Sequence, residues 1–463
     1  MRTAMLAVTP VALLAAACPT RTLALIETDQ AKEEVKDVPA ELNRNVDILF
    51  VVDNSGSMAA EQASVRANFQ RFMDVLEGIE GGLPSVHIGV VSSDVGVGHD
   101  LAGACNPMGD DGRLRTGKTS CPMVMGRYIS DEEVAGGRQR NYSGSLADAF
   151  SCMADLGTAG CGLEQHLEAV RLALDPQANP QNAGFLRPDA YLAVVFLADE
   201  DDCSAADRSV FAPGDDVAGA LGPVGFRCAR WGVTCDGSEI ATTPGTAYGE
   251  CSSWDGSPYM RHPRDYVAFL GGLKPDPALV LVAAITGDAE PFAVAATAGE
   301  NGAEVDKSCG KVAGDPNAGA APGIRFRDFL AGFPGRSTWV SICQDDLSGA
   351  LEQVAGLIVD KLVPCLTSTV DETDLDAANP GLQIACQVSD VLWPGTDRQV
   401  EQVLPRCAMA DDANPAAAAA APCWYVVRDL VQCAAYPTRL ALGVKRDVSP
   451  PAGTHVIARC VTR

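Results

Sequence analysis

The chain is short of basic residues. Its 463 residues include 35 Lys and Arg against 60 Asp and Glu, which gives a formal net charge of −25. No basic face exists to neutralise phosphates, so the composition argues against nucleic acid as a partner. The acidic excess is typical of a soluble protein. The more specific interpretation is that the protein has affinity for cations or for basic partners. With 47% hydrophobic residues, the chain still has ample material for a large buried core.

The N-terminus lacks an apolar run long enough to cross a bilayer. The stretch from Ala4 to Ala17 is interrupted by Pro10 and is shorter than the ~20 residues that a spanning helix needs. We therefore expect residues 1–18 to be a signal peptide. The sequence from Ala15 to Cys18 resembles a bacterial lipobox, which implies lipidation of Cys18. Cleavage by ordinary signal peptidase at the same A-x-A pattern is the alternative.

These features predict an exported protein that is lipid-anchored in a bacterial cell envelope, facing the periplasm or the outside. Residues 19–44 are polar and charged, and we expect them to be a tether between Cys18 and the folded part.

Motifs for catalysis and for zinc are also missing. The sequence has no H-E-x-x-H, no phosphate-cradling Gly loop and no Ser/His/Asp arrangement. No close C-x-x-C pair occurs, which argues against metal–thiolate sites. We expect the protein not to be an enzyme, with a metal-dependent hydrolase as the less favoured alternative.

Cysteines, in contrast, are plentiful. The 17 Cys less Cys18 leave 16, an even number that is typical of disulfides in an exported chain. They fall into even groups, which are Cys105, Cys121, Cys152 and Cys161; Cys203, Cys228, Cys235 and Cys251; Cys309 and Cys343; and Cys365, Cys386, Cys407, Cys423, Cys433 and Cys460. Up to eight disulfides are possible, and spacing does not fix which Cys pairs with which.

The most informative stretch runs from Asn45 to Met58. Val46 to Val52 is nearly all apolar and ends abruptly in Asp53-Asn54-Ser55-Gly56-Ser57, as expected of a buried parallel strand that delivers polar groups at its C-terminal end. One carboxylate and two hydroxyls can converge there. Such hard oxygens suit Mg²⁺, Mn²⁺ or Ca²⁺. The alternative is a strand-to-helix turn capped by Ser55 or Ser57.

Buried strands alternate with amphipathic helices over residues 45–364. This order predicts an α/β fold with a doubly wound, mostly parallel sheet and helices on both faces. Cys- and Gly-rich segments near 97–150, 204–264 and 287–335 are expected to be insertions. Residues 365–463 show short apolar runs separated by Pro, Gly and Asp, and predict a small Cys-rich β domain.

The Asp53-x-Ser55-x-Ser57 pattern after a buried strand resembles the metal-ion-dependent adhesion site (MIDAS) of von Willebrand factor type A (vWA) domains. That resemblance implies a Rossmann-like fold and two further metal-binding residues, Thr158 ahead of a helix and Asp199 after the strand at 189–198. Thr158 as a helix N-cap is the alternative.

Two other acids follow Asp199 closely. Asp201 and Asp202 are candidates for a second cation, and the alternative is a solvated acidic loop. Within the helix after Thr158, we expect His166 and Glu168 to be surface groups.

The whole layout is similar to that of Cys-rich vWA bacterial lipoproteins of mostly undetermined role. The resemblance implies direct cation binding by Ser55, Ser57 and Thr158, while Asp53 and Asp199 act largely through water. The cation keeps an open position for a carboxylate from a protein partner. We therefore expect a divalent-cation-dependent, adhesion-type protein-binding module. A structural envelope protein, or a complex subunit in which the metal is only stabilising, is the alternative.

Overall fold

The computed structural model describes residues 33–40, 44–79, 82–99, 105–115, 124–135, 137–213, 220–297, 302–310, 318–344, 346–372, 380–394, 398–433, 436–451 and 454–462. The predicted signal peptide, Cys18 and Cys121 lie outside these residues. Within the same ranges, no helix is both long enough and apolar enough to cross a membrane.

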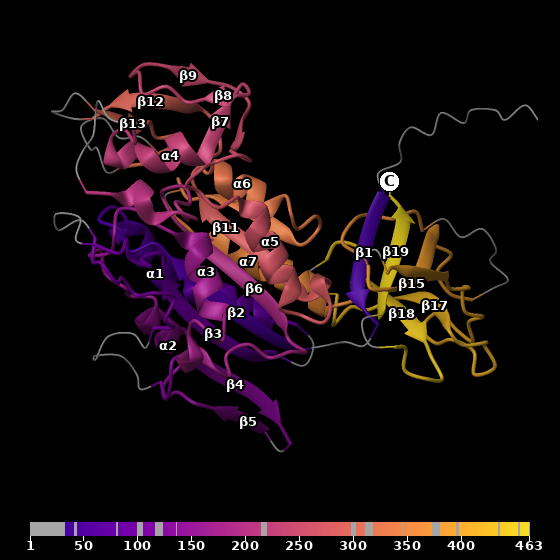
Figure 1. The fold of residues 1–463 in the computed structure, drawn as a ribbon. Coiled ribbons are helices and arrows are strands. Elements are labelled where there is room, and N and C mark those ends of the chain that lie inside the picture. Colours follow the sequence, from indigo (N-terminus) through magenta and orange to yellow (C-terminus); the bar gives the residue numbers. More distant parts are fainter. Residues whose placement is uncertain are drawn as a thin grey trace, which may run out of the picture.

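A seven-stranded sheet forms the centre of the larger part of the molecule (Figure 1). Its strands in spatial order are β14 (Ser337–Ser341), β11 (Val280–Thr286), β6 (Tyr191–Leu197), β2 (Asn45–Val52), β3 (Ser85–Ser92), β4 (Ile129–Val134) and β5 (Gly137–Arg140). Neighbours from β14 to β3 are parallel, and β4 and β5 add antiparallel strands at one edge. The expected mixed α/β fold with a mostly parallel sheet is confirmed.

Alternate side chains of β2 enter two separate hydrophobic cores. Ile48 and Phe50 belong to one core, and Leu49 and Val51 belong to the other. The first core includes side chains from α1 (Ala59–Glu77), α2 (Leu146–Met153) and α7 (Ser348–Leu362), and the second from α3 (His166–Leu174), α5 (Pro263–Gly272) and α6 (Ile324–Leu330). A strand that is buried on both faces accounts for the nearly continuous apolar run in its sequence.

The order of the parallel strands reverses at β2. The chain passes from β2 to β3 on one side and later returns to β6 on the other side of β2. In open α/β sheets, ligands bind beyond the carboxyl ends of the strands at such a reversal. The residues that follow β2 and β6 therefore occupy the position where a binding site is expected.

Parts of the expected insertions at 204–264 and 287–335 fold together into one lobe, at the top of Figure 1. Their side chains share a core that includes Phe226, Val233, Phe292 and Val294. The expectation for 287–335 is corrected at α6, whose Phe326 and Phe329 pack in the second core against the main sheet. The lobe contains α4 (Arg227–Gly232), a sheet of β10 (Cys251–Ser253), β7 (Val233–Cys235) and β8 (Ser238–Glu239), and a sheet of β13 (Ala303–Val305), β12 (Phe292–Ala296) and β9 (Ala247–Tyr248). Short 3₁₀ helices occur at η1 (Pro180–Asn182), η2 (Arg208–Phe211), η3 (Val224–Phe226) and η4 (Pro277–Leu279).

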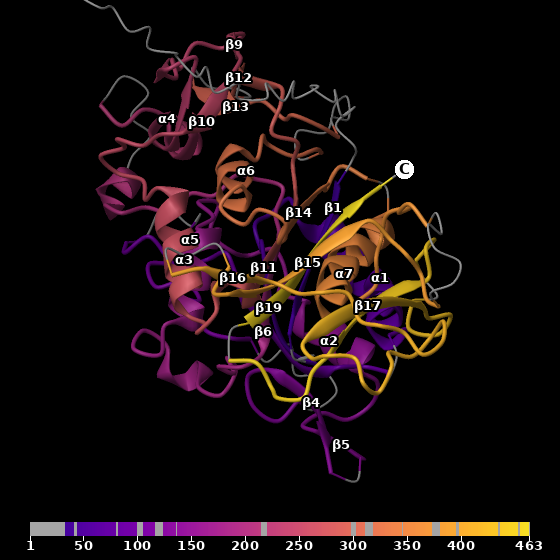
Figure 2. The same ribbon diagram turned by 90° about the vertical axis from the view of Figure 1, so that its right-hand side faces the viewer.

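The C-terminal residues form separate β structure, drawn in yellow and orange beside the main sheet (Figures 1 and 2). One sheet has the order β1 (Glu33–Pro39), β19 (Thr454–Val461), β15 (Cys386–Leu392) and β16 (Val400–Val403), and β17 (Cys423–Arg428) pairs with β18 (Leu440–Lys445). Strand β1 corrects our expectation of a tether over 19–44, because this part of the segment pairs antiparallel with β19.

Seven disulfides join described residues. The pairs are Cys105–Cys161, Cys203–Cys228, Cys235–Cys251, Cys309–Cys343, Cys365–Cys433, Cys386–Cys460 and Cys407–Cys423. Cys152 is disulfide-bonded as well. Every one of the seven pairs falls within one of the even groups seen in the sequence. Disulfides in this number are typical of proteins that fold in an oxidising compartment, which supports export.

Candidate metal centre

Two acids follow the neighbouring strands at the reversal point. Asp53 comes directly after β2, and Asp199 comes two residues after the end of β6. The backbone N–H of Asp53 donates to the carbonyl of Leu197 at 2.9 Å, and the carbonyl of Asp199 accepts from Ala321 N at 2.8 Å. Parallel pairing of β2 with β6 thus brings the starts of the two acid-bearing loops together.

The Asp53 carboxylate is fully buried and only half satisfied. Its Oδ1 accepts from the backbone N–H of Ser55 at 2.8 Å, a bond that fixes the turn into α1. Its Oδ2 is buried and has no hydrogen-bond partner. A buried acceptor left without a donor costs about 1–3 kcal/mol, and more when it is charged.

The two serines of the predicted motif lie side by side. Ser55 Oγ is 3.3 Å from Ser57 Oγ, and the Ser55 side chain is buried while that of Ser57 is half-buried. The Ser57 hydroxyl lies close enough to the Asp199 carboxylate to lower its pKa. The structure therefore brings Asp53, Ser55, Ser57 and Asp199 together.

Asp199 is buried and lies close to other negatively charged side chains. Burial raises the pKa of its carboxyl to about 7, and the negative charges of Asp53 and Glu200 contribute to this, against a smaller opposing effect of the Ser57 hydroxyl. Its Oδ1 is buried and has no hydrogen-bond partner. A cation at this position would relieve both the repulsion and the missing bond.

Glu164 is a third buried acid, and sequence reasoning missed it. Its side chain is 2% exposed, and its Oε1 has no hydrogen-bond partner. Burial raises its pKa well above the usual range, and the charges of Glu200, Asp53 and Asp199 raise it further. The one available signal was an acid just ahead of α3, which is equally typical of ordinary helix starts.

His166, the first residue of α3, is also buried rather than at the surface. Neither ring nitrogen has a hydrogen-bond partner, and Nε2 lies 3.5 Å from Asp53 Oδ2. Glu168, likewise expected at the surface, is buried, accepts from the Tyr266 hydroxyl at 3.0 Å and pairs with Arg171. The hypothesis that both residues are surface groups is wrong, because this end of α3 packs into the molecule.

Thr158 is not brought into the buried set. Its loop passes over the start of α1, where Gly160 N donates to the carbonyl of Asn54 at 2.8 Å and Gln62 Nε2 donates to that of Gly157 at 3.0 Å. The side chain of Thr158 itself is exposed. Thr158, which the family resemblance implies as a cation ligand, is therefore not among the buried residues next to Asp53.

Asp201 and Asp202 are engaged by protein donors. Asp201 accepts from the backbone N–H of Arg325 at 2.9 Å, at the start of α6. Asp202 pairs with the Arg325 guanidinium at 2.9 Å and accepts from Leu167 N at 2.9 Å at the start of α3. These contacts fix two helices, and they account for the acidic run after β6 without a second cation.

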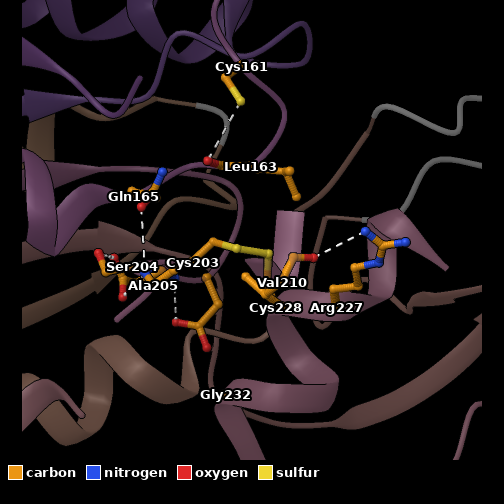
Figure 3. Close-up of a disulfide and its surroundings, with 12 residues drawn as sticks. Cys161, Leu163, Gln165, Cys203, Ser204, Ala205, Val210, Arg227, Cys228 and Gly232 are labelled. Atoms are coloured by element: carbon orange, nitrogen blue, oxygen red, sulfur yellow. Dashed lines mark hydrogen bonds between the residues drawn. A yellow bond between two sulfur atoms is a disulfide. The ribbon is translucent and has the colours of Figure 1, made fainter. Parts of the chain in front are cut away.

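Two disulfides hold the loops that carry the acids. Cys203, four residues after Asp199, is bonded to Cys228 of the insertion lobe (Figure 3). Cys161, three residues before Glu164, is bonded to Cys105. Figure 3 also shows Gln165 accepting from Ala205 N, which ties the segment before α3 to the segment after Cys203.

These groups can bind a hard divalent cation only if hydroxyls and carboxylates both serve as ligands. Over the described ranges, no three or more His, Cys, Asp or Glu side chains form a group that could hold a metal ion. The serine hydroxyls are therefore needed as ligands beside the carboxylates. Buried carboxylate oxygens without donors, next to two hydroxyls, match the oxygen ligands preferred by Mg²⁺, Mn²⁺ and Ca²⁺.

Comparisons with known proteins give only distant similarities. No family model matches the chain, and no curated protein matches it. Among solved structures, the chain is similar to the conserved hypothetical protein BatB from Bacteroides thetaiotaomicron (TM-score 0.27, 11% identity, covering 68% of this chain and 97% of that one). It is also similar to the pilus adhesin SpaC from Lactobacillus rhamnosus GG (TM-score 0.30, 10% identity, covering 92% of this chain and 42% of that one). A third similar structure is a von Willebrand factor type A protein from Catenulispora acidiphila (TM-score 0.27, 10% identity, covering 93% of this chain and 65% of that one). At these TM-scores the similarities carry no argument about function.

Proposed function

We propose that the protein is a divalent-cation-dependent protein-binding module of the adhesion type. The observation that carries the proposal is the pair of buried, unpartnered oxygens, Asp53 Oδ2 and Asp199 Oδ1, at the reversal point of the sheet. Ser55 and Ser57 add hydroxyls at the start of α1. The resemblance of the Asp53-x-Ser55-x-Ser57 pattern to the vWA metal site supports the proposal.

Each residue has a distinct task in the proposed site. Asp53 shapes the turn through its bond to Ser55 N and leaves its second oxygen free for the cation or for a cation-bound water. Ser57 supplies a hydroxyl next to Asp199. The bound cation would offer an open coordination position to an oxygen of a protein partner, which we expect to be a carboxylate.

Titration calorimetry of residues 19–463, oxidised, tests the site. We expect saturable binding of at least one of Ca²⁺, Mg²⁺ and Mn²⁺, and its loss in Asp53→Asn, which keeps the shape of the side chain but removes its charge. Glu77→Gln is a matched control, because Glu77 is an exposed acid at the far end of α1. Equal binding by wild type and Asp53→Asn would refute the site.

Partner binding needs a separate measurement. The immobilised wild-type protein should retain an envelope protein in Ca²⁺ or Mg²⁺, and should release it in EDTA or when Asp53 is replaced by Asn. Retention that persists in chelator would exclude a metal-dependent interaction.

A purely stabilising metal is the second candidate function. It is favoured by the free-energy cost of the unpartnered acids, since a cation there would raise stability whether or not a partner exists. In that case the cation raises Tm, while EDTA leaves partner retention unchanged. We propose binding rather than catalysis because the sequence offers no catalytic motif.

We further propose that residues 1–18 direct export and that Cys18 carries the lipid anchor. The disulfides support the exported location. Fractionation of expressing cells tests the anchor, with wild type expected in membranes and Cys18→Ser expected in the soluble exported fraction. Membrane association of Cys18→Ser equal to that of wild type would refute it.

A further inference from the structure

His166, the first residue of α3, is a buried histidine whose ring nitrogens have no hydrogen-bond partner among the described residues. Two other buried histidines differ in this respect. His87 has Nδ1 2.8 Å from the carbonyl of Phe185 and Nε2 2.7 Å from Glu132 Oε1, and His455 meets an acid at each nitrogen. A buried imidazole without partners lowers stability, so an apolar side chain would suit this position better unless the ring has a function.

The Nε2 atom of His166 faces the proposed cation site. It lies 3.5 Å from Asp53 Oδ2, which also has no hydrogen-bond partner among the described residues, and both side chains are fully buried. An N–H donor and an oxygen acceptor thus face each other in the interior, at a separation slightly longer than that of an ordinary hydrogen bond. The two side chains come from α3 and from the turn after β2.

The backbone around His166 holds the ring in this position. The N–H of Gln165 donates to the carbonyl of Ser93 at 3.0 Å, which ties the start of α3 to the segment after β3. The N–H of Leu167 donates to Asp202 Oδ1 at 2.9 Å, which ties it to the segment after β6. The residues before and after His166 are therefore both anchored at the edge of the sheet where Asp53 lies.

The Asp53 carboxylate has one oxygen that remains to be oriented. Its Oδ1 accepts from Ser55 N at 2.8 Å, so the rest of the turn already fixes that end. A carboxylate oxygen has two acceptor positions, and Oδ2 can therefore accept from His166 and still face the cation or a cation-bound water. The imidazole is steadied from another side by the ring of Phe326 in α6, with centroids 5.2 Å apart.

We propose that His166 is a positioning residue of the cation site: its Nε2–H donates to Asp53 Oδ2 when the cation is bound, and this bond holds the carboxylate in the orientation that the cation needs. The proposal rests on the proposed function, because it assumes a cation beside Asp53. His166 acts through Asp53 and is not itself a ligand. This agrees with the finding that no three or more His, Cys, Asp or Glu side chains in the described ranges form a metal-holding group.

The separation of 3.5 Å is compatible with this role. Hydrogen bonds in unliganded sites are often long and tighten when the ligand is bound. Groups that hydrogen-bond to a metal ligand orient it, and their mutation typically changes metal affinity by about 10–100-fold. His166 should therefore affect cation affinity although it does not touch the cation.

Titration calorimetry of the same oxidised protein with Ca²⁺, Mg²⁺ and Mn²⁺ alone tests the proposal. His166→Leu keeps a similar bulk but has no donor, and we expect it to lose about tenfold in cation affinity. His166→Gln keeps an N–H donor at a similar reach and should bind within about threefold of wild type. His87→Leu is the matched control, because His87 is a buried histidine opposite Asp47, near the start of β2, and should leave cation affinity unchanged.

Thermal unfolding in EDTA separates positioning from packing. His166→Leu removes two buried nitrogens without partners, so its Tm without metal should equal or exceed that of wild type although its cation affinity falls. His87→Leu removes the donor to the carbonyl of Phe185 and should lower Tm. If both His166 variants had a lower Tm in EDTA and lost cation affinity to the same extent, the ring would serve packing and the proposal would be overturned.

The two proposals fail in different ways. Wild type that binds none of the three cations refutes the proposed function itself. Cation binding that is lost in Asp53→Asn but unchanged in His166→Leu leaves the site in place and refutes the role of His166.

Discussion

At the scale of single residues, the buried charges fall into two kinds. Arg325 and Asp202 are almost completely buried and satisfy each other, and the guanidinium also donates to the carbonyl of Arg261 at 2.7 Å. Asp53, Asp199 and Glu164 are equally buried but leave oxygens without donors. The first kind holds α6 and α3 in place, and the second is what a ligand site requires.

Removal of Arg325 should destabilise the whole domain. Arg325→Ala leaves Asp202 buried without its cation, so we expect a loss of about 3–5 kcal/mol in the free energy of unfolding. Urea denaturation measures it. Arg264→Ala is the control, because the pair of Arg264 with Asp255 is exposed to solvent and should contribute little to the free energy of unfolding. Equal losses in the two variants would contradict the distinction.

From the sequence alone we predicted the residues that follow the end of a buried strand. We missed Glu164, which is held in place by loop contacts. Asp53, Ser55 and Asp199 follow apolar runs whose burial is evident, so their place at the sheet edge could be inferred. Glu164 could not be found in this way, because contacts distant in sequence fix its place. Its carbonyl accepts from Cys203 N, and the N–H of the next residue, Gln165, donates to the carbonyl of Ser93.

At the scale of elements, the missed strand and helix both contain buried charges. Strand β1 has a sequence typical of a polar tether, but Glu34 accepts from Thr367 and Ser368, and Lys36 Nζ donates to the carbonyl of Asp360 at 2.7 Å. The sequence pattern did not predict helix α6, because the charged residue Arg325 occupies a buried position in it. Hydrophobic periodicity fails where a charged side chain is buried with a distant partner.

The disulfide Cys105–Cys161 should affect cation binding as well as stability, because Cys161 follows Gly160, whose N–H donates to the carbonyl of Asn54 beside Asp53. It holds the loop that leads to Glu164, whereas Cys407–Cys423 lies in the C-terminal β structure. Each double Cys→Ala variant should lose about 2–5 kcal/mol of stability. Only the first should lower cation affinity, by about tenfold. Calorimetry on both variants measures their cation affinities. Equal affinities of the two variants would show that cation binding does not need the Cys105–Cys161 restraint.

At the scale of the whole molecule, a histidine joins the C-terminal sheet to the main domain. His455 of β19 has Nδ1 2.7 Å from Asp37 Oδ1 and Nε2 2.5 Å from Asp276 Oδ2. Both nitrogens can donate only when the ring is protonated. Burial alone would lower the pKa of His455, but the hydrogen bonds to Asp276 and Asp37 and their charges raise it to about 9.

Stability should therefore fall at alkaline pH. Because the folded pKa lies above the ordinary 6.5, the contribution of the imidazolium is fully present below about pH 6.5 and is lost as the pH rises through about 9. The difference in Tm between wild type and His455→Gln, measured from pH 6 to pH 10, should shrink across this window. A constant difference would indicate that the charge of His455 does not contribute. Arg336 and Lys361, which also act on Asp37, are unchanged in the comparison.

The pairing of β1 with β19 also determines when the C-terminal sheet can form during synthesis of the chain. Glu33 lies opposite Val461, so the first described strand of the chain is completed by the last one. While the polypeptide is being synthesised, the parallel sheet from β2 to β14 has all of its strands before β19 exists. Strand β1, whose Val38 belongs to the C-terminal core, therefore has no strand to pair with in its sheet until the final residues have been made.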